Sequence, residues 1–149
     1  MEDSTFKQDS GFSCRDSVKL TMSDIKDFKD LRIWSLGIKI VKEVYLVTAS
    51  FPQSEQFGLT NQMRRASVSI PSNIAEGHIK NQTKEFGRFL NISLGSCAEL
   101  ETQMIIAKEL GWINENIFND LLGQIRAEIK QINALKKRLT ESRQLNPDN

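Results

Sequence analysis

The sequence predicts an all-α protein, an up-down-up-down bundle of four helices. Apolar residues recur every three or four positions in four successive stretches, the stretches are roughly 20 to 30 residues long, and short connections join them. Of 149 residues, 39% are hydrophobic and 26% are charged, as in an ordinary soluble domain. The bundle is expected over residues 27–143. Residues 1–26 and 144–149 lack a sustained apolar period and are expected to be flexible tails.

The first helix is expected to begin just after Asp27 or Asp30 and to end near Ala49. Asp27 or Asp30 can cap its start, and Pro52 excludes helical geometry at the preceding residue, so the helix should end near Ala49. Apolar positions separated by three and four residues predict one buried stripe. Its members are Leu31, Trp34, Ile38, Val41, Tyr45 and Thr48.

The second helix carries a stripe from Leu59 to Ile74. Pro71 lies within it and predicts either a kink or a break at which Asn73 caps a new start. Gly77 is expected to end this helix, because glycine readily adopts the left-handed conformation found after helix C-termini.

The third helix is expected from Thr83, as its cap, to Gly111. Gly95, in the middle of this stretch, costs helix stability and therefore predicts the close approach of another helix. Asn114 is expected to cap the fourth helix, whose stripe runs from Phe118 to Leu139.

Few residues suit catalysis or metal binding, and neither an enzyme nor a cofactor is expected. The single histidine, His78, is expected in an exposed turn, and Cys97 lies on the buried stripe of the third helix as a structural thiol. The other cysteine, Cys14, lies far from Cys97 in the chain, so no disulfide framework is expected. No phosphate-binding glycine loop is present.

Glu101 falls within the apolar face of the third helix. A buried carboxylate needs donors or a cation, because an unpaired buried charge is costly. A structural network with arginine or amide groups of the second helix is favoured over a general acid or base role, since a second catalytic group is lacking.

A basic stripe on the fourth helix is the best candidate site. Between Arg126 and Arg143 there are six cations and two acids, a local net charge of +4. Arg126, Lys130 and Lys137 fall within about 40° on a helical wheel and face away from the core stripe. Either they form a solvated outer face, or they bind nucleic-acid phosphates. The candidate residues of this helix are Arg126, Lys130, Lys136, Lys137 and Arg138.

Three further cations belong to the candidate set. Arg64 and Arg65 flank the core stripe of the second helix on opposite sides, where they can pair with acids within or between subunits or bind nucleic acid. Lys80 follows the same helix and is the third.

The segment from Phe51 to Glu101 resembles a known family. The run Ser69-Ile70-Pro71-Ser72-Asn73-Ile74-Ala75-Glu76-Gly77 is similar to a signature of the bacterial proteins encoded in intervening sequences of 23S rRNA genes. The accessory variability determinant of diversity-generating retroelements looks like a relative of that family. The resemblance covers about residues 28–142, with Lys80 at a place where the family usually has arginine.

The resemblance implies a left-handed bundle and ring-shaped homopentamers, but no settled activity. Its retroelement relative binds nucleic acid through a basic surface and partners a reverse transcriptase. Apolar residues off the predicted stripes independently suggest a subunit interface; they are Ile33, Leu36, Val44, Leu46, Phe89 and Ile92.

Two functions are therefore weighed. The first is a non-enzymatic oligomer that binds RNA or DNA phosphates, favoured by the clustered cations. The second is a protein-interaction scaffold without nucleic-acid binding, favoured by the total charge of only +1. The longest uncharged run is eleven residues, Val44–Ser54, which is too short to span a membrane. The acidic start is unlike a signal peptide, so a cytoplasmic location is expected.

Overall fold

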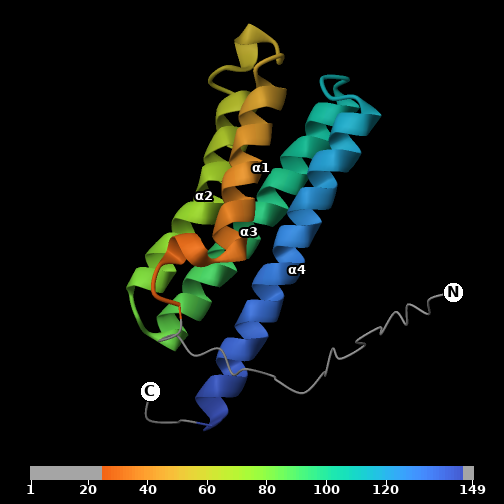
Figure 1. Cartoon of the computed structure of the whole chain (residues 1–149). Coiled ribbons are helices and arrows are strands. Elements are labelled where there is room, and N and C mark those ends of the chain that lie inside the picture. Colours follow the sequence, from red (N-terminus) through yellow and green to blue (C-terminus); the bar gives the residue numbers. More distant parts are fainter. Residues whose placement is uncertain (1–24, 146–149) are drawn as a thin grey trace, which may run out of the picture.

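Four long helices run alternately up and down through residues 25–145, the part of the chain described by the computed structural model (Figure 1). They are α1 (Arg32–Thr48), α2 (Leu59–Ile79), α3 (Thr83–Glu109) and α4 (Glu115–Leu145), with the short 3-10 helices η2 (Phe28–Asp30) and η3 (Gln53–Glu55). Residues 25–145 contain no β-strand, so the predicted all-α bundle is confirmed. The helix α4 continues past the expected boundary at residue 143, while most of the predicted N-terminal tail, with Cys14, lies outside the described residues.

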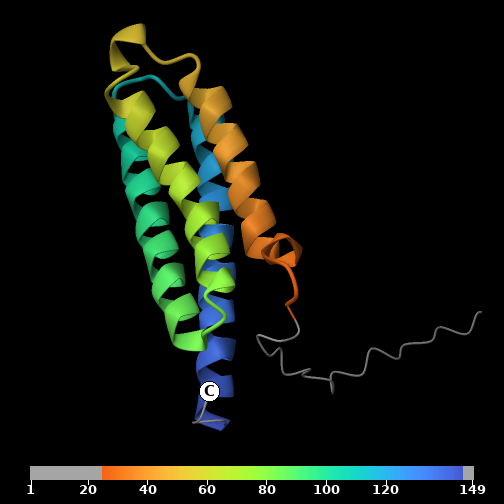
Figure 2. The same ribbon diagram turned by 90° about the vertical axis from the view of Figure 1, so that its left-hand side faces the viewer.

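Each helix packs against two others, so that the four surround one core (Figure 2). The helix α2 lies between α1 and α3, and α4 closes the bundle against α3 and α1. The longest helix, α4, extends below the start of α1 (Figure 1). Fully buried side chains come from all four helices; the largest are Ile40, Met63, Ile70, Ile74, Phe86, Leu90, Leu100, Met104, Ile125 and Ile132.

The predicted core face of α1 is wrong by about a third of a turn. Ile38 and Tyr45 are 37% and 45% exposed, whereas Ile33, Ile40 and Val44 are buried. Both stripes are apolar and both have helical spacing, so periodicity alone does not choose between them. The buried stripe includes Gly37, where an added β-carbon would lie 3.2 Å from the β-carbon of Pro71. Close approach to α2 therefore fixes which face of α1 turns inward.

The helix α2 passes through Pro71 without a break, so of the two predicted alternatives, a kink or a break, the break with a restart at Asn73 is wrong. The amide of Asn73 instead donates to the carbonyl oxygen of Ser69, 2.8 Å away, so it does not cap a helix start. Gly77 does not end the helix, which continues to Ile79. Its missing side chain admits α3, because a β-carbon on Gly77 would lie 2.6 Å from that of Phe89.

The expected close approach at Gly95 is also wrong. Gly95 is exposed, and no atom lies within 4 Å of the position of an added β-carbon. Contact between α2 and α3 is made beside it, where the hydroxyl of Ser96 donates to that of Ser69 at 2.8 Å. Thr83 is the first residue of α3 rather than its cap, which is Gln82.

Three of the predicted helix ends are confirmed, the first being that of α1, which ends at Thr48 with Ala49 as its C-cap. Gly111 follows α3 with a φ of +77°, the left-handed conformation that favours glycine. The side-chain oxygen of Asn114 accepts a hydrogen bond from the backbone N–H of Ile117 at 2.9 Å and so caps α4. Among residues 25–145, no helix is apolar enough over a sufficient length to cross a bilayer.

Candidate nucleic-acid interface

The exposed side of α4 carries the predicted basic stripe. Lys130 and Lys137 are exposed, as expected. Arg126 is exposed too, but its guanidinium pairs with Glu101 of α3, with 3.4 Å between Nη2 and Oε1. The expectation that Glu101 bonds to α2 is therefore wrong, because its partner comes from α4. Arg126 is already engaged, whereas no ion pair within the described chain involves Lys130 or Lys137.

A groove lies where the start of α3 meets the end of α4, with a volume of about 410 Å³. We call it the basic groove. Four cations and one acid line it: Lys84 and Arg88 from α3, Lys136 and Arg143 from α4, and Glu85. The remaining lining residues are Thr83, Gly87, Asn91, Leu139 and Thr140.

Charge within the basic groove is only partly compensated. Glu85 pairs with Arg88, with 3.1 Å between Oε2 and Nη2. Lys84, Lys136 and Arg143 take part in none of the ion pairs of residues 25–145. Three free cations and one neutralised pair leave a groove that attracts anions.

The first turn of α3 adds to this positive potential. Its cap, Gln82, makes no side-chain hydrogen bond to the helix. The first N–H groups of an α-helix have no intrahelical acceptor, and the helix dipole places partial positive charge there. The basic groove thus combines cationic side chains from α3 and α4 with the positive N-terminal end of α3.

The two sides of this groove are about 50 residues apart in the sequence, and for this reason Lys84 and Arg88 were not predicted as candidate site residues. The predicted topology could have identified them, because in an up-down bundle α3 begins at the end of the bundle where α4 finishes. Of the predicted cations, Lys136 lines the groove. Lys137 and Arg138 are exposed but point about 100° and 200° further around α4.

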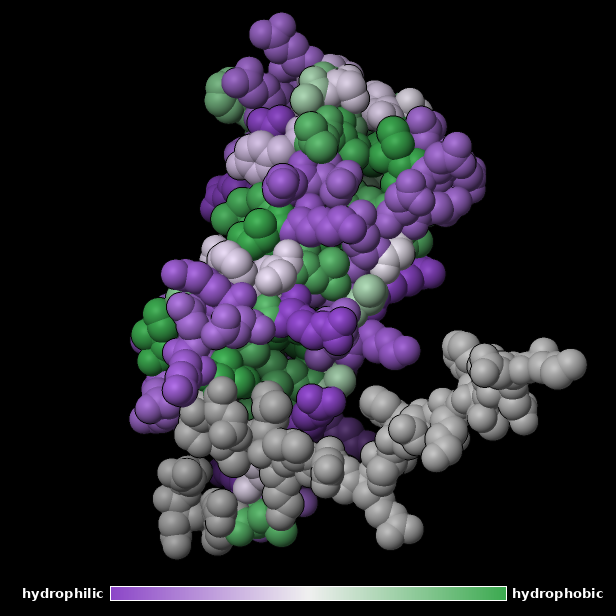
Figure 3. Space-filling model, in the orientation of Figure 1, coloured by the Kyte–Doolittle hydropathy of each residue, from purple (hydrophilic) through white to green (hydrophobic). Residues whose placement is uncertain are grey.

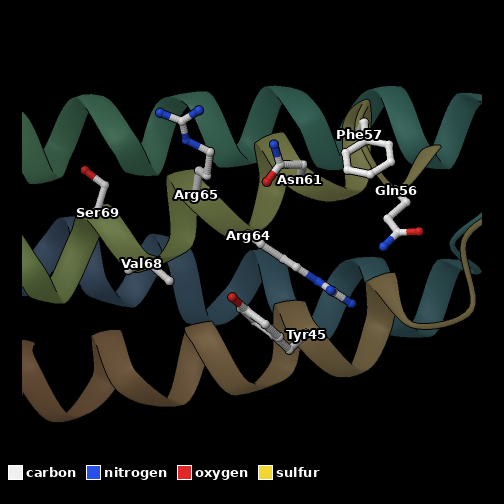
Figure 4. Close-up of a pocket in the computed structure, with 8 residues that line it drawn as sticks. All are labelled: Tyr45, Gln56, Phe57, Asn61, Arg64, Arg65, Val68 and Ser69. Carbon is white, nitrogen blue, oxygen red and sulfur yellow. The ribbon is translucent and has the colours of Figure 1, made fainter.

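Arg64 and Arg65 lie at the opposite end of the bundle, in a pocket between α1 and α2 (Figure 4). They point to different sides of α2, as the sequence predicts. Neither forms an ion pair with any described residue, so their expected intrachain pairing with acids is not seen. Lys80 is exposed in the turn between α2 and α3 and does not line the groove.

His78 is half-buried on α2 and not exposed in a turn as predicted. Its Nε2 lies 2.9 Å from the carbonyl oxygen of Ile25, an acceptor, so Nε2 carries the hydrogen. Its ring also meets the rings of Phe28 and Phe86 edge to face. These contacts give His78 a structural role at the lower end of the bundle.

Cys97 and Glu128 are fully buried. Burial, and secondarily the nearby Glu128 and Glu101 carboxylates, raises the pKa of the Cys97 thiol to about 12, so it is an inert structural thiol as predicted. Burial also raises the pKa of Glu128 to about 8. Glu128 was not predicted as a core residue, although it stands on the apolar stripe between Ile125 and Ile132. No cluster of three or more metal-ligating side chains occurs among residues 25–145.

The chain matches the model of a known protein family. The model of the 23S rRNA-intervening sequence protein family matches residues 29–134, which covers most of the bundle. No individual curated protein matches the chain significantly.

Proposed function

Because the chain belongs to the 23S rRNA-intervening sequence protein family, whose membership carries no defined activity, we propose its function from its surface. The protein is a non-enzymatic, self-associating helical bundle that binds phosphates of RNA or DNA. Binding takes place in the basic groove, and the exposed Lys130 and Lys137 provide a second cationic surface about 100–120° around α4 from Lys136.

The observation that carries this proposal is the convergence of cations from two helices. Lys84 of α3 lines the same groove as Lys136 and Arg143 of α4, and no described acid pairs with any of the three. Phosphate contacts of this kind supply affinity through counterion release. They fix position without reading sequence, so binding to RNA or DNA of mixed sequence is expected.

Self-association increases the effect of a modest site. Hydrophobic side chains reach the surface at several places between hydrophilic ones (Figure 3). Three exposed apolar residues, Ile92, Ile106 and Leu110, lie on one outward side of α3 and its C-cap and are 41%, 44% and 53% exposed. An oligomer built through this row presents several basic grooves to one nucleic acid, and linked sites gain avidity without new contacts.

The second candidate is a protein-interaction scaffold that binds no nucleic acid. The same apolar row on α3 favours it, since such rows mark protein contacts. The total charge of +1 also favours it, because no long-range field attracts a polyanion to the whole molecule.

The test is salt-dependent binding to mixed-sequence RNA and DNA. The triple variant Lys84→Ala, Lys136→Ala, Arg143→Ala removes the free cations of the groove. Affinity should fall, and the slope of log affinity against log salt should shrink by about 0.7–0.9 for each phosphate that the variant no longer neutralises.

The matched control is Lys39→Ala, Lys42→Ala, a pair of exposed lysines on α1 with Glu43 beside them. This variant should retain wild-type affinity and slope. Undetectable binding by the wild-type protein at about 50 mM salt, where electrostatic attraction is strong, would exclude the nucleic-acid function and leave the scaffold.

A further inference from the structure

The pocket between α1 and α2 differs from the basic groove in its chemistry. It is an open surface pocket with a volume of about 680 Å³. Two arginines, two aromatic rings and two amides contribute to it, and no acidic residue does. Its lining is Tyr45, Gln56, Phe57, Asn61, Arg64, Arg65, Val68 and Ser69 (Figure 4).

Arg64 is held in place by neutral groups. Its Nε donates to the hydroxyl oxygen of Thr48 at 2.9 Å, and that hydroxyl in turn donates to the carbonyl oxygen of Val44 at 2.7 Å. Its guanidinium carbon lies 4.5 Å from the centre of the Tyr45 ring. These contacts orient the side chain without neutralising it, and its two terminal nitrogens have no partner among the described residues.

Arg65 adds a second free charge on the outer face of α2. Its side chain is exposed and points away from Arg64 (Figure 4). The α1–α2 pocket is therefore a preorganised cationic site on one side and an adjustable one on the other. Because the two arginines point to different sides of α2, they can contact separate anionic groups of one ligand but cannot clamp a single small anion together.

Phe57 supplies an aromatic surface at one end of the pocket. Its side chain is 89% exposed, the most exposed large hydrophobic residue in the described part of the chain. The amides of Gln56 and Asn61 lie at the same end (Figure 4). A free aromatic ring beside amide donors and acceptors is the combination that takes up an unstacked nucleobase.

We propose that the α1–α2 pocket binds an unpaired nucleotide of a single-stranded nucleic acid. The base stacks on Phe57, and the amides of Gln56 and Asn61 bond to its edge. Arg64 and Arg65 hold the flanking phosphates. This inference rests on the proposed function and adds a preference for single-stranded over double-stranded nucleic acid, since bases within a duplex are not available for stacking on a protein side chain.

The pocket's chemistry favours a nucleotide over an acidic peptide. The carboxylates of an acidic peptide would contact the arginines but not the exposed aromatic ring or the two amides beside it. A nucleotide uses all three features at once, and its planar base matches the sequence-tolerant stacking platforms of single-strand binding proteins.

The experiment compares three labelled ligands of equal length on the full chain: a mixed-sequence single strand, its duplex, and an abasic strand that keeps the phosphates. The variant Phe57→Leu removes the ring and keeps an apolar side chain. It should weaken single-strand binding about 5- to 150-fold, the range for removing one stacked base, and leave duplex and abasic binding unchanged. Ile79→Ala, a 69% exposed residue of α2 outside this pocket, is the control and should change nothing.

A second variant tests the cationic side. Arg65→Gln should weaken binding of both the single strand and the abasic strand and reduce their salt slope by about 0.7. Duplex binding through the basic groove should be unaffected.

Failure of this inference and failure of the proposed function are distinguishable. If Phe57→Leu leaves single-strand binding unchanged, or weakens all three ligands equally, the stacking site is wrong while groove binding stands. If Phe57→Leu changes the oligomeric mass in light scattering without a selective loss of single-strand binding, the pocket is a subunit interface and the inference is overturned. If the wild-type protein binds none of the ligands, both proposals fall.

Discussion

Gly77 of α2 and Phe89 of α3 meet so closely that a β-carbon added to Gly77 would lie 2.6 Å from the β-carbon of Phe89. That β-carbon cannot swing away as the tip of a flexible side chain does, so the helices would have to separate. We expect Gly77→Ala to lower the free energy of unfolding by about 1–3 kcal/mol, the usual cost of overpacking. Denaturant unfolding measures this change.

Gly95→Ala is the matched control on α3. Its added methyl group meets no atom within 4 Å, and alanine is the better helix former by about 1 kcal/mol. This variant should therefore be more stable than wild type. Equal loss of stability in both variants would contradict the close approach at Gly77.

The buried Glu128 makes stability depend on pH. Its pKa of about 8 in the folded protein stands above the usual 4.5, so the native state holds this proton more firmly than the unfolded state does. Between those two values the free energy of unfolding should fall as pH rises, by up to about 1.4 kcal/mol per pH unit. Below about pH 4.5 this contribution is fully present, and above about pH 8 it is lost.

Glu128→Gln removes the titration and should flatten this pH profile. The variant should be more stable than wild type at pH 8, because glutamine carries no charge to bury. Glu141→Gln, an exposed change on the same helix, should keep the wild-type profile. Urea midpoints measured across this pH range give the comparison, and a wild-type profile in Glu128→Gln would show that another group controls it.

Glu128 also marks a limit of prediction from sequence. Glu128 lies three residues after Ile125 and four before Ile132, a spacing that predicts burial. Glutamate is nevertheless usually found on the protein surface, so its charge favoured the opposite prediction. The fold, the end of α1, and the ends at Gly111 and Asn114 were predictable because local chemistry determines them. The inward face of α1 was not, since the close approach of Gly37 to Pro71 joins residues far apart in the chain. The basic groove could not be predicted for the same reason, because Lys84 and Lys136 come together only in the folded protein.

Cys97 should be protected from thiol reagents in the native protein. It is fully buried, so a reagent cannot reach the sulfur atom. Its pKa is about 12, so the thiol is protonated at neutral pH and the reactive thiolate is not formed. In a Cys14→Ser background, an aromatic disulfide reagent should react only after unfolding in guanidinium. Rapid reaction under native conditions would mean that α3 and α4 separate readily.

Self-association should be visible in light scattering. The chain mass is 17.0 kDa, and the family resemblance leads us to expect about five times that value at micromolar concentration. Ile106→Lys should reduce the mass by placing a charge in the apolar row of α3. Ile105→Lys is a close control, because Ile105 is 45% exposed but points about 100° away. A monomeric wild-type protein would exclude the oligomer.

The pair formed by Arg126 and Glu101 predicts a gain of binding. Their 3.4 Å ion pair occupies an arginine of the predicted stripe with a carboxylate from α3. Glu101→Gln removes the carboxylate that pairs with Arg126 and so frees Arg126, and nucleic-acid affinity should rise and the salt slope should steepen by up to about 0.9. Stability should change little, because the pair lies at the surface, with side chains 66% and 27% exposed, and surface pairs contribute about 0–1 kcal/mol.

Arg126→Ala and Lys130→Ala complete this comparison. Because Arg126 is paired and Lys130 is not, we expect Lys130→Ala to weaken binding more, although both remove one positive charge. In the Glu101→Gln background the two losses of affinity should become equal, since Arg126 is then as free as Lys130. Filter binding across a salt series gives each affinity. If Arg126→Ala costs as much as Lys130→Ala while Glu101 is intact, the ion pair does not hold Arg126 away from phosphate, and the stripe binds as one surface.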